Sequence, residues 1–298
     1  MISLRIFLVS VFLVFTTISA NSDVLYVFDY DQHEYIVGEK KEKLLVGYTA
    51  NRKYSDKRSK LTSGFMKRWF GKEQELRYTT VFLMDKDIIR QIDYGKEKIL
   101  ETSFSKLKDP KLHKKIEKRK IPEVKQRVDA RYEVKKPLLT VKELSKSKKI
   151  DDYSVRHVQA TLLMETFDKK KNSISRTEIL LDLFLTEDIP GYREYKNFYT
   201  LLGKRLGIDS IKFGNLERLT KYMQDSLKLK QAIRKATGFP VKTFFQVKGI
   251  YITKPNTSSE KRVERVFKKE TVSLRKVTQG PFDLKMFSPP KKWVVKSD

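Results

Sequence analysis

The residues that could support metal or acid–base chemistry are few, and they are scattered along the chain. The three histidines, His33, His113 and His157, lie in different segments, and there is no cysteine. A zinc site needs several converging nitrogen, oxygen or sulfur ligands, and no HExxH or comparable spacing is present. His157 lies among apolar neighbours on an expected strand, without a partner that would make it a general base. We therefore predict no metal site, no cofactor and a structural role for His157.

Two pairs of adjacent acidic residues, Asp151–Asp152 and Glu187–Asp188, are better explained by turns than by catalysis. Neighbouring residues on a strand point to opposite faces, so adjacency does not make a catalytic pair. The first pair precedes an expected strand, and Asp188 precedes Pro190 where a helix is expected to begin, so turn and capping roles explain both. The G-x-S-x-G, phosphate-loop and dinucleotide-binding motifs are also absent. The sequence therefore predicts a protein that is not an enzyme.

The N-terminal residues indicate export. They contain one early positive charge at Arg5, an apolar run over residues 6–15 and a small-residue ending at Ser19–Ala20, the pattern of a cleaved secretory signal peptide. The apolar run is shorter than the roughly 20 residues that a spanning helix needs, and an uncleaved anchor is the alternative. We expect a signal peptide over residues 1–20 and a single β-rich domain over 21–298, periplasmic or secreted. The absence of disulfides favours a core large enough to be stable alone.

The chain is strongly basic, with a formal net charge of +27. Lysine and arginine are spread over its whole length, and aromatic residues are interleaved with them in segments such as 52–69. Such surfaces can hold nucleic acid through phosphate contacts and stacking. An export signal, however, directs the protein away from nucleic acid. The expected partners are therefore anionic envelope lipids or polymers.

The expected elements are organised around residues 176–191, where an apolar strand, Ile179 to Leu185, gives way to the turn Asp188-Ile189-Pro190-Gly191. Runs of β-formers predict a hairpin from Val24, with its turn at 38–43, and an antiparallel meander over 77–103. Apolar residues at every second position of 158–164 predict a strand with one buried face, joined to the next strand by a turn at 168–173. Further strands are expected at 241–253 and at 262–277, the last one long and bulged.

Helical excursions are expected at about 52–72, 105–121 and 192–237. In the first, Leu61, Phe65 and Trp69 recur at four-residue spacing, with Phe70, Lys67 and Arg68 beside them. This apolar helix face either packs on the sheet or lies on an anionic membrane. The second excursion is highly charged. The third contains two apolar stripes, each followed by a glycine, which predict two amphipathic helices.

Short motifs, in this order, resemble a known family. They are I-D-D-Y at 150–153, L-T-E-D-I-P at 185–190, T-G-F-P-V at 237–241 and M-F-S-P-P-K-K-W at 286–293. Together they look like the uncharacterised exported bacterial proteins grouped with the lipoprotein carrier LolA, over roughly residue 76 to the C-terminus. Members usually have a tryptophan before the D-I-P turn, where this chain has Phe184 and Leu185.

The resemblance implies an α+β fold, in which a curved antiparallel sheet forms an incomplete barrel and helices cover its concave face. It implies no catalytic residues, and it implies an apolar ligand, such as a lipid, an acyl chain or a lipoprotein segment. The residues expected to line that cavity, or else to fill it as core, are Leu162, Met164, Leu183, Leu185, Phe198, Leu202, Leu219, Met223, Leu227 and Phe244. The alternative is a structural or surface-interaction protein with a filled core, held at an anionic membrane by its basic surface and by the segment containing Leu61, Phe65 and Trp69.

Overall fold

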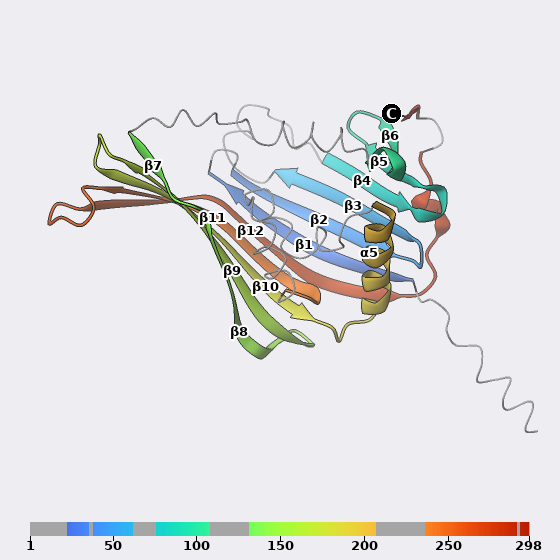
Figure 1. Cartoon of the computed structure of the whole chain (residues 1–298). Coiled ribbons are helices and arrows are strands. Elements are labelled where there is room, and N and C mark those ends of the chain that lie inside the picture. Colours follow the sequence, from blue (N-terminus) through green and yellow to red (C-terminus); the bar gives the residue numbers. More distant parts are fainter. Residues whose placement is uncertain are drawn as a thin grey trace, which may run out of the picture.

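The computed structural model describes residues 23–35, 38–61, 76–107, 131–206, 236–290 and 293–297. These residues form one 13-stranded sheet in the order β13-β6-β5-β4-β3-β2-β1-β12-β11-β10-β9-β7, with β8 also paired to β9. The pair β13–β6 is parallel, and the other pairs are antiparallel. The sheet is large and curved, and it is not closed within the described residues (Figure 1). This confirms the predicted curved antiparallel sheet.

The chain builds the sheet in two runs of strands, and α5, the longest helix of the described residues, lies within the second run, between β10 and β11. The first run contains β1 Val24–Glu34, β2 Gly38–Tyr48, β3 Arg52–Leu61, β4 Leu76–Leu83, β5 Ile88–Asp93 and β6 Lys98–Ser103. The second contains β7 Tyr132–Val134, β8 Leu138–Ile150, β9 Tyr153–Asp168, β10 Ser173–Thr186, β11 Phe239–Thr253 and β12 Lys261–Gln279, followed by the short β13 Val295–Ser297. The helices are α3 Phe104–Leu107 and α5 Tyr192–Leu206, with 3-10 turns η1 Met84–Lys86 and η3 Leu284–Phe287.

Residues 176–191 form the predicted strand and the turn that follows it. Residues 179–185 lie in β10, which pairs with β9 on one side and β11 on the other, so this is an internal strand. The following turn leads directly into α5, where the Tyr195 N–H donates to the Gly191 carbonyl at 3.0 Å. Within the turn, the Thr186 hydroxyl accepts the Asp188 N–H at 3.1 Å. Thr186, rather than Asp188, therefore contributes a side chain to the hydrogen bonding of this turn.

The other strand predictions hold, with one turn misplaced. The β1–β2 hairpin, the β4–β6 meander, the 168–173 turn and the long bulged strand β12 are confirmed. Residues 38–43, predicted as the first turn, instead belong to β2. Charged residues alternate between the two faces here: Glu42 is buried, and Lys41 and Lys43 are exposed. A strand with charges on both faces lacks the apolar alternation from which strands are predicted.

The predicted helix over 52–72 is wrong for residues 52–61, which form β3. Tyr54 and Asp56, two residues apart, are both buried, as expected for positions on the same face of a strand. Residues 62–72 lie outside the described residues. In the second predicted excursion, α3 covers residues 104–107, and the prediction beyond them is likewise outside the described residues. In the third, α5 confirms a helix over residues 192–206, and the second predicted helix lies, up to residue 235, outside the described residues.

The two faces of the sheet are covered by different parts of the chain. We call the face that carries α5 the inner face and the opposite one the outer face. On the outer face, the C-terminal segment packs Phe282, Met286 and Phe287 against Tyr54, Val81 and Leu83. The Arg90 guanidinium anchors this segment by donating to the Phe287 carbonyl at 2.8 Å. The sheet is therefore sandwiched at its β1–β6 half.

Candidate binding surfaces

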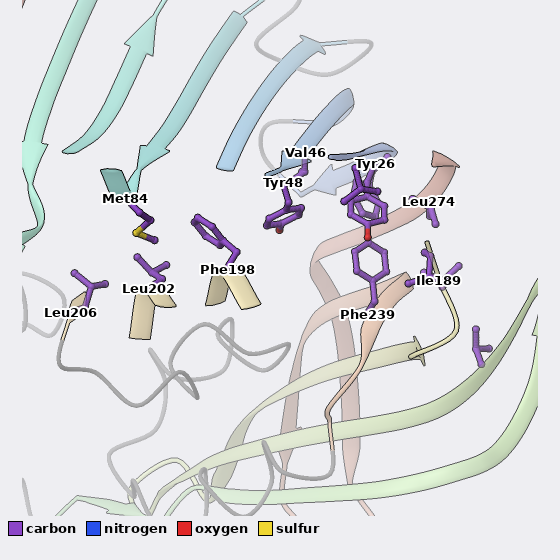
Figure 2. Close-up of a cluster of buried hydrophobic side chains, with 14 of the residues drawn as sticks. Tyr26, Val46, Tyr48, Met84, Ile189, Phe198, Leu202, Leu206, Phe239 and Leu274 are labelled. Atoms are coloured by element: carbon purple, nitrogen blue, oxygen red, sulfur yellow. The ribbon is translucent and has the colours of Figure 1, made fainter. Parts of the chain in front are cut away.

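Aromatic and aliphatic side chains pack together beneath α5 (Figure 2). We call this group the α5 cluster, and its buried members are Val24, Tyr26, Phe28, Val46, Tyr48, Met84, Phe104, Val155, Ile189, Phe198, Leu202, Leu206, Phe239, Val241 and Leu274. On β1, every second residue from Val24 to Phe28 is buried, and on α5 the buried residues recur at three- or four-residue spacing. Phe198 packs edge-on against Tyr48, with ring centroids 5.6 Å apart, and Phe239 lies 4.3 Å from Tyr26. Contacts of this kind leave little room for a ligand beneath α5.

Polar groups at the margin of the α5 cluster are also satisfied. The Lys53 ammonium lies 5.0–5.6 Å from the ring centroids of Tyr48, Phe82 and Tyr199, and it donates to the Tyr199 hydroxyl at 2.7 Å. The Tyr26 hydroxyl donates to the Pro190 carbonyl at 2.8 Å. Burial, followed by the nearby Glu194 charge, raises the pKa of Tyr26 well above its usual value. This hydroxyl therefore stays protonated at physiological pH, and its hydrogen bond to the Pro190 carbonyl stabilises the turn before α5.

A second apolar group, the β9–β10 cluster, lies further along the inner face. Its members come from strands, apart from Ala236, and almost no surface of any of them is accessible: Val158, Ala160, Leu162, Ile179, Leu181, Leu183, Leu185, Ala236 and Phe245. Cross-strand register explains the grouping, because Leu181 lies opposite both Ala160 and Phe245. Directly paired residues project from the same face, so alternation on three strands produces one continuous apolar surface.

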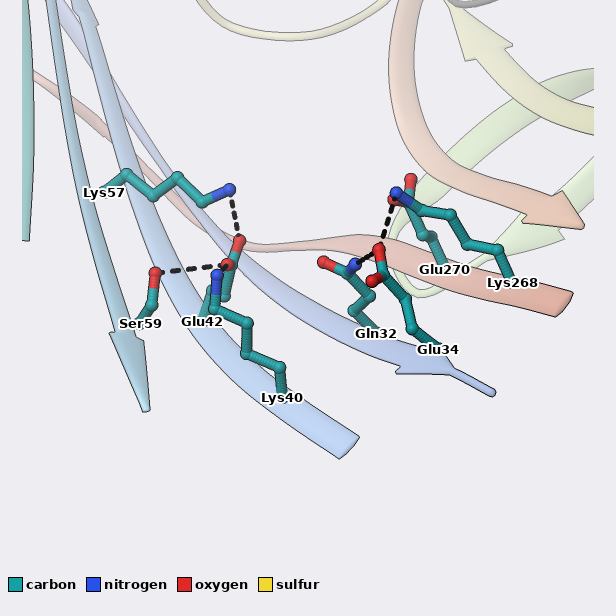
Figure 3. Close-up of polar contacts among 8 residues, drawn as sticks. All are labelled: Gln32, Glu34, Lys40, Glu42, Lys57, Ser59, Lys268 and Glu270. Atoms are coloured by element: carbon teal, nitrogen blue, oxygen red, sulfur yellow. Dashed lines mark hydrogen bonds and ion pairs between the residues drawn. The ribbon is translucent and has the colours of Figure 1, made fainter. Parts of the chain in front are cut away.

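A charged cluster on the inner face adjoins the β9–β10 cluster. It contains Gln32, Glu34, Lys40, Glu42, Lys57, Ser59, Lys268 and Glu270 (Figure 3). The Glu42 carboxylate is fully buried and lies 2.5 Å from Lys40 and 2.6 Å from Lys57, and it accepts the Ser59 hydroxyl at 3.1 Å. Lys268 bridges Glu270 at 2.7 Å and Glu34 at 3.1 Å. Three carboxylates thus match three ammonium groups, and the cluster is neutral.

The ion pairs explain how charges persist on this buried surface. Burial alone would lower the pKa of Lys268, but hydrogen bonds from Lys268 to Glu270 and Glu34 raise it above its usual value. Glu270 lies directly opposite Gln32 on β1 and Phe245 on β11. The charged cluster is therefore part of the packed sheet surface.

Replacing Glu42 with alanine should lower the free energy of unfolding by about 1–3 kcal/mol, because it removes the acceptor of the Ser59 hydroxyl and the ion-pair partner of Lys40 and Lys57. The loss should stay below that of a fully buried pair, because the Lys40 and Lys57 side chains are 24% and 41% exposed and can turn to water. Urea unfolding measures the loss of stability. The control is Glu133→Ala, a substitution of an exposed residue on β7. Equal stability of the two variants would contradict a structural role for the cluster.

A cleft of about 560 Å³ lies where β9 begins and β10 ends. Its walls combine apolar and charged side chains: Lys146, Ser154, Val155, Arg156, Leu185, Thr186, Glu187, Asp188 and Thr237. Arg156 is fixed by donating to the Thr237 carbonyl at 2.8 Å and by Glu143 at 3.2 Å. The volume falls within the range of small-molecule sites, and both signs of charge are present. Leu185 connects the cleft to the β9–β10 cluster.

His157 has a partner that the sequence could not reveal. Its Nε2 lies 2.8 Å from the Asp182 Oδ1, which also accepts the Gln159 amide at 3.0 Å, and its ring stacks on Phe184 at 4.3 Å. The pairing arises because β9 and β10 align His157 with Phe184 and Gln159 with Asp182. A carboxylate shared between two donors and a ring stacked on a neighbour hold this histidine in a fixed arrangement.

The predicted cavity residues do not form one group. Leu162, Leu183 and Leu185 lie in the β9–β10 cluster, with Met164 partly buried at its margin, whereas Phe198 and Leu202 lie in the α5 cluster. The placement of Phe244 with them is wrong, because Phe245 faces the cluster and Phe244, its neighbour on a strand, faces the other way, near the Lys269 ammonium at 5.6 Å. The predictions for Leu219, Met223, Leu227, Phe65, Trp69, Phe70, Lys67 and Arg68, and for the Leu61 side chain, lie outside what the structure describes.

Comparison of the sequence with protein-family models and with curated proteins found no match. The resemblance to LolA-like proteins therefore stays a prediction. Among the described residues, no helix has the length and apolar character needed to cross a membrane. In the same part of the chain, no group of three or more histidine and acidic side chains is arranged to hold a metal ion.

Proposed function

We propose that this chain is an exported, non-catalytic protein with a filled core that binds anionic lipid surfaces. The observation that carries the proposal is the matching of buried charge. Each of the six buried charged side chains in the described residues has an oppositely charged partner: Glu42, Asp56, Arg90, Glu165, Glu194 and Glu270. Arg90 is the only cation among them. The excess positive charge of the described part therefore lies at the surface, where anionic lipid can reach it.

The physics of this attraction is simple. Each lysine or arginine near an anionic bilayer contributes about 1 kcal/mol, and the contribution decays within a Debye length of about 10 Å at moderate salt. A few exposed basic residues on one side of the molecule are therefore enough for binding. The ring-filled α5 cluster favours this function over a ligand held between α5 and the sheet. An export signal would bring the protein to such a surface.

A second candidate function is the binding of an amphiphile, as the LolA-like resemblance implies. The observation that favours it is the 560 Å³ cleft, which joins Arg156 and Lys146 to the apolar Leu185 and Val155. An anionic headgroup could contact the two cations while its chain follows the apolar wall. In this second candidate, the ligand lies at the end of β10, whereas the sequence predicted it beneath α5.

Two measurements on the full chain separate the candidates. Flotation with vesicles of phosphatidylcholine, with and without phosphatidylglycerol, should show binding that requires phosphatidylglycerol. Native mass spectrometry of protein purified from its host should show the bare mass. A tightly retained lipid that disappears in Arg156→Ala, together with flotation indifferent to phosphatidylglycerol, would favour the second candidate. Leu201→Ala, an exposed change on α5, is the matched control for the purified protein.

A further inference from the structure

The far ends of the long strands project beyond the rest of the sheet (Figure 1). We call this projection the arm. It contains β7, the end of the β9–β10 hairpin over residues 164–178, and the end of the β11–β12 hairpin over residues 248–267. The arm consists of strands and turns, and no described helix packs on it.

One face of the arm exposes apolar side chains. The register aligns Val134, Thr166, Ser175, Tyr251 and Val263 as one row across five strands. Directly paired residues project from the same face, so Val134, Tyr251 and Val263 share it, at 59%, 41% and 58% exposure. Tyr132, two residues before Val134, projects from the same face and is 41% exposed.

Two further side chains extend this face. The Phe267 ring lies so close over Gly249 that a Cβ on Gly249 would be 2.3 Å from it, and Gly249 is two residues from Tyr251 on the same strand. The Arg265 guanidinium, opposite Gly249, lies 4.6 Å from the centre of the Tyr35 ring. Phe267 and Tyr35 are 45% and 54% exposed. The arm face, as we call it, is made by Tyr35, Tyr132, Val134, Tyr251, Val263 and Phe267.

This concentration is not scattered surface exposure. The described part of the chain exposes twelve large apolar side chains, and six of them lie on the arm face. Single exposed apolar residues are normal on proteins, but a contiguous patch indicates an interaction site.

The charges of the arm are segregated between its two faces. On the face opposite the arm face, Glu165 pairs with Lys135 and Arg176 at 2.6 Å each, and hydrogen bonds from Lys135 and Arg176 lower its pKa. Lys248 lies 3.3 Å from Glu178 and 3.5 Å from Glu264 on that same side. Glu165, Glu178 and Glu264 are thus neutralised by partners within the sheet.

The arm face and its tips are basic. Arg131 lies 4.9 Å from the Tyr132 ring and pairs with Asp168 at 2.6 Å, and this hydrogen bond lowers the pKa of Asp168 to about 2. Exposed cations then surround the apolar side chains, at the turns and along β12: Lys169, Lys170, Lys171, Lys254, Lys261 and Arg265. A face that combines tyrosine, phenylalanine and valine with a basic rim matches the composition of surfaces that lie in the interface of an anionic bilayer.

We propose that the arm face is the surface through which the protein binds an anionic lipid bilayer. Val263, Tyr251 and Phe267 enter the interfacial layer, and the lysines of the two turns contact the headgroups. This rests on the proposed function and identifies the surface that performs it. Charge complementarity selects the occupant, because a second copy of this chain would bring a like-charged rim against the first.

A triple variant tests the proposal. Tyr251→Ser, Val263→Ser and Phe267→Ser together should weaken binding to vesicles of phosphatidylcholine and phosphatidylglycerol by at least about tenfold, because about 1.4 kcal/mol corresponds to that factor and each buried apolar side chain contributes comparably. The matched control replaces three exposed apolar residues elsewhere, Tyr78, Leu144 and Leu201, with serine and should bind like the unaltered chain. Circular dichroism verifies that both variants are folded.

The absence of native cysteine permits a second, independent readout. An environment-sensitive fluorophore on Val263→Cys should shift to the blue and become protected from aqueous quencher on vesicle addition, whereas the same label on Leu201→Cys should not. Undiminished binding of the triple variant with a water-exposed label at position 263 would overturn the arm proposal and leave surface binding intact. Failure of the unaltered chain to bind these vesicles would overturn both. A dimer that the triple variant converts to monomers, with vesicle binding unchanged, would make the arm face a protein interface instead.

Discussion

Replacing Gly191 with alanine should lower the free energy of unfolding by about 3 kcal/mol or more, one of the two largest single effects that we expect in this chain. Gly191 has a φ of +79°, a left-handed conformation that costs L-residues about 1–2 kcal/mol. A Cβ there would also lie 2.4–2.6 Å from the side chain of Val24, which is fully buried on β1. Neither β1 nor the turn before α5 can yield without disturbing the α5 cluster, so the two costs add.

Chemical denaturation measures the change, and a second glycine separates its two causes. Gly280 also has a positive φ, +142°, but no atom lies within 4 Å of the position of its Cβ. Gly280→Ala therefore carries backbone strain without a clash and should cost less than Gly191→Ala. Equal losses at the two positions would show that the contact with Val24 does not determine how α5 docks.

Replacing Phe198 with alanine should destabilise the protein by about 3–5 kcal/mol, as expected for a large aromatic side chain removed from a close-packed core. Phe198 is inaccessible to solvent, and its ring lies 5.6 Å from Tyr48 and 5.8 Å from Phe82, each centre to centre. One helical turn away, Leu201 is 42% exposed, and Leu201→Ala should change stability by less than about 0.5 kcal/mol.

The Phe198 variant also addresses the function. A filled core leaves a cavity when the ring is removed, so its loss is costly. If Phe198→Ala were nearly as stable as Leu201→Ala, the space beneath α5 would have to be loosely packed. A ligand between α5 and the sheet, as the sequence led us to expect, would then regain support over the filled core.

The sequence predicted those elements in which apolar residues repeat with a clear period. Strand β10 and helix α5 have such patterns, and both were expected at nearly their observed positions. The prediction failed where buried positions are occupied by charged residues. Asp56 on β3 is buried and accepts hydrogen bonds from Arg77 and Thr79. The helix was predicted across it because Leu61, Phe65 and Trp69 recur at helical spacing. Local pattern cannot show that a carboxylate will be paired by residues from another strand.

The arm face could not be predicted for a related reason. Its residues lie between positions 35 and 267 and become neighbours only through the register of several strand pairs. A shift of one residue in any pair would send Tyr251 or Val263 to the other face. The prediction for Phe244 was wrong for the same reason. Phe244 and Phe245 are adjacent, and the sequence does not indicate which of the two faces the β9–β10 cluster.

The central claim, that exposed basic charge and the arm face hold this protein at anionic bilayers, is tested most directly by a salt series. Partitioning of the unaltered chain onto vesicles of phosphatidylcholine and phosphatidylglycerol should be strong at low ionic strength and fall as sodium chloride is added, because the ions screen the lysines. Pure phosphatidylcholine vesicles should bind far less at every salt concentration. Partitioning that is equal on the two kinds of vesicle, or that does not change with salt, would contradict the claim.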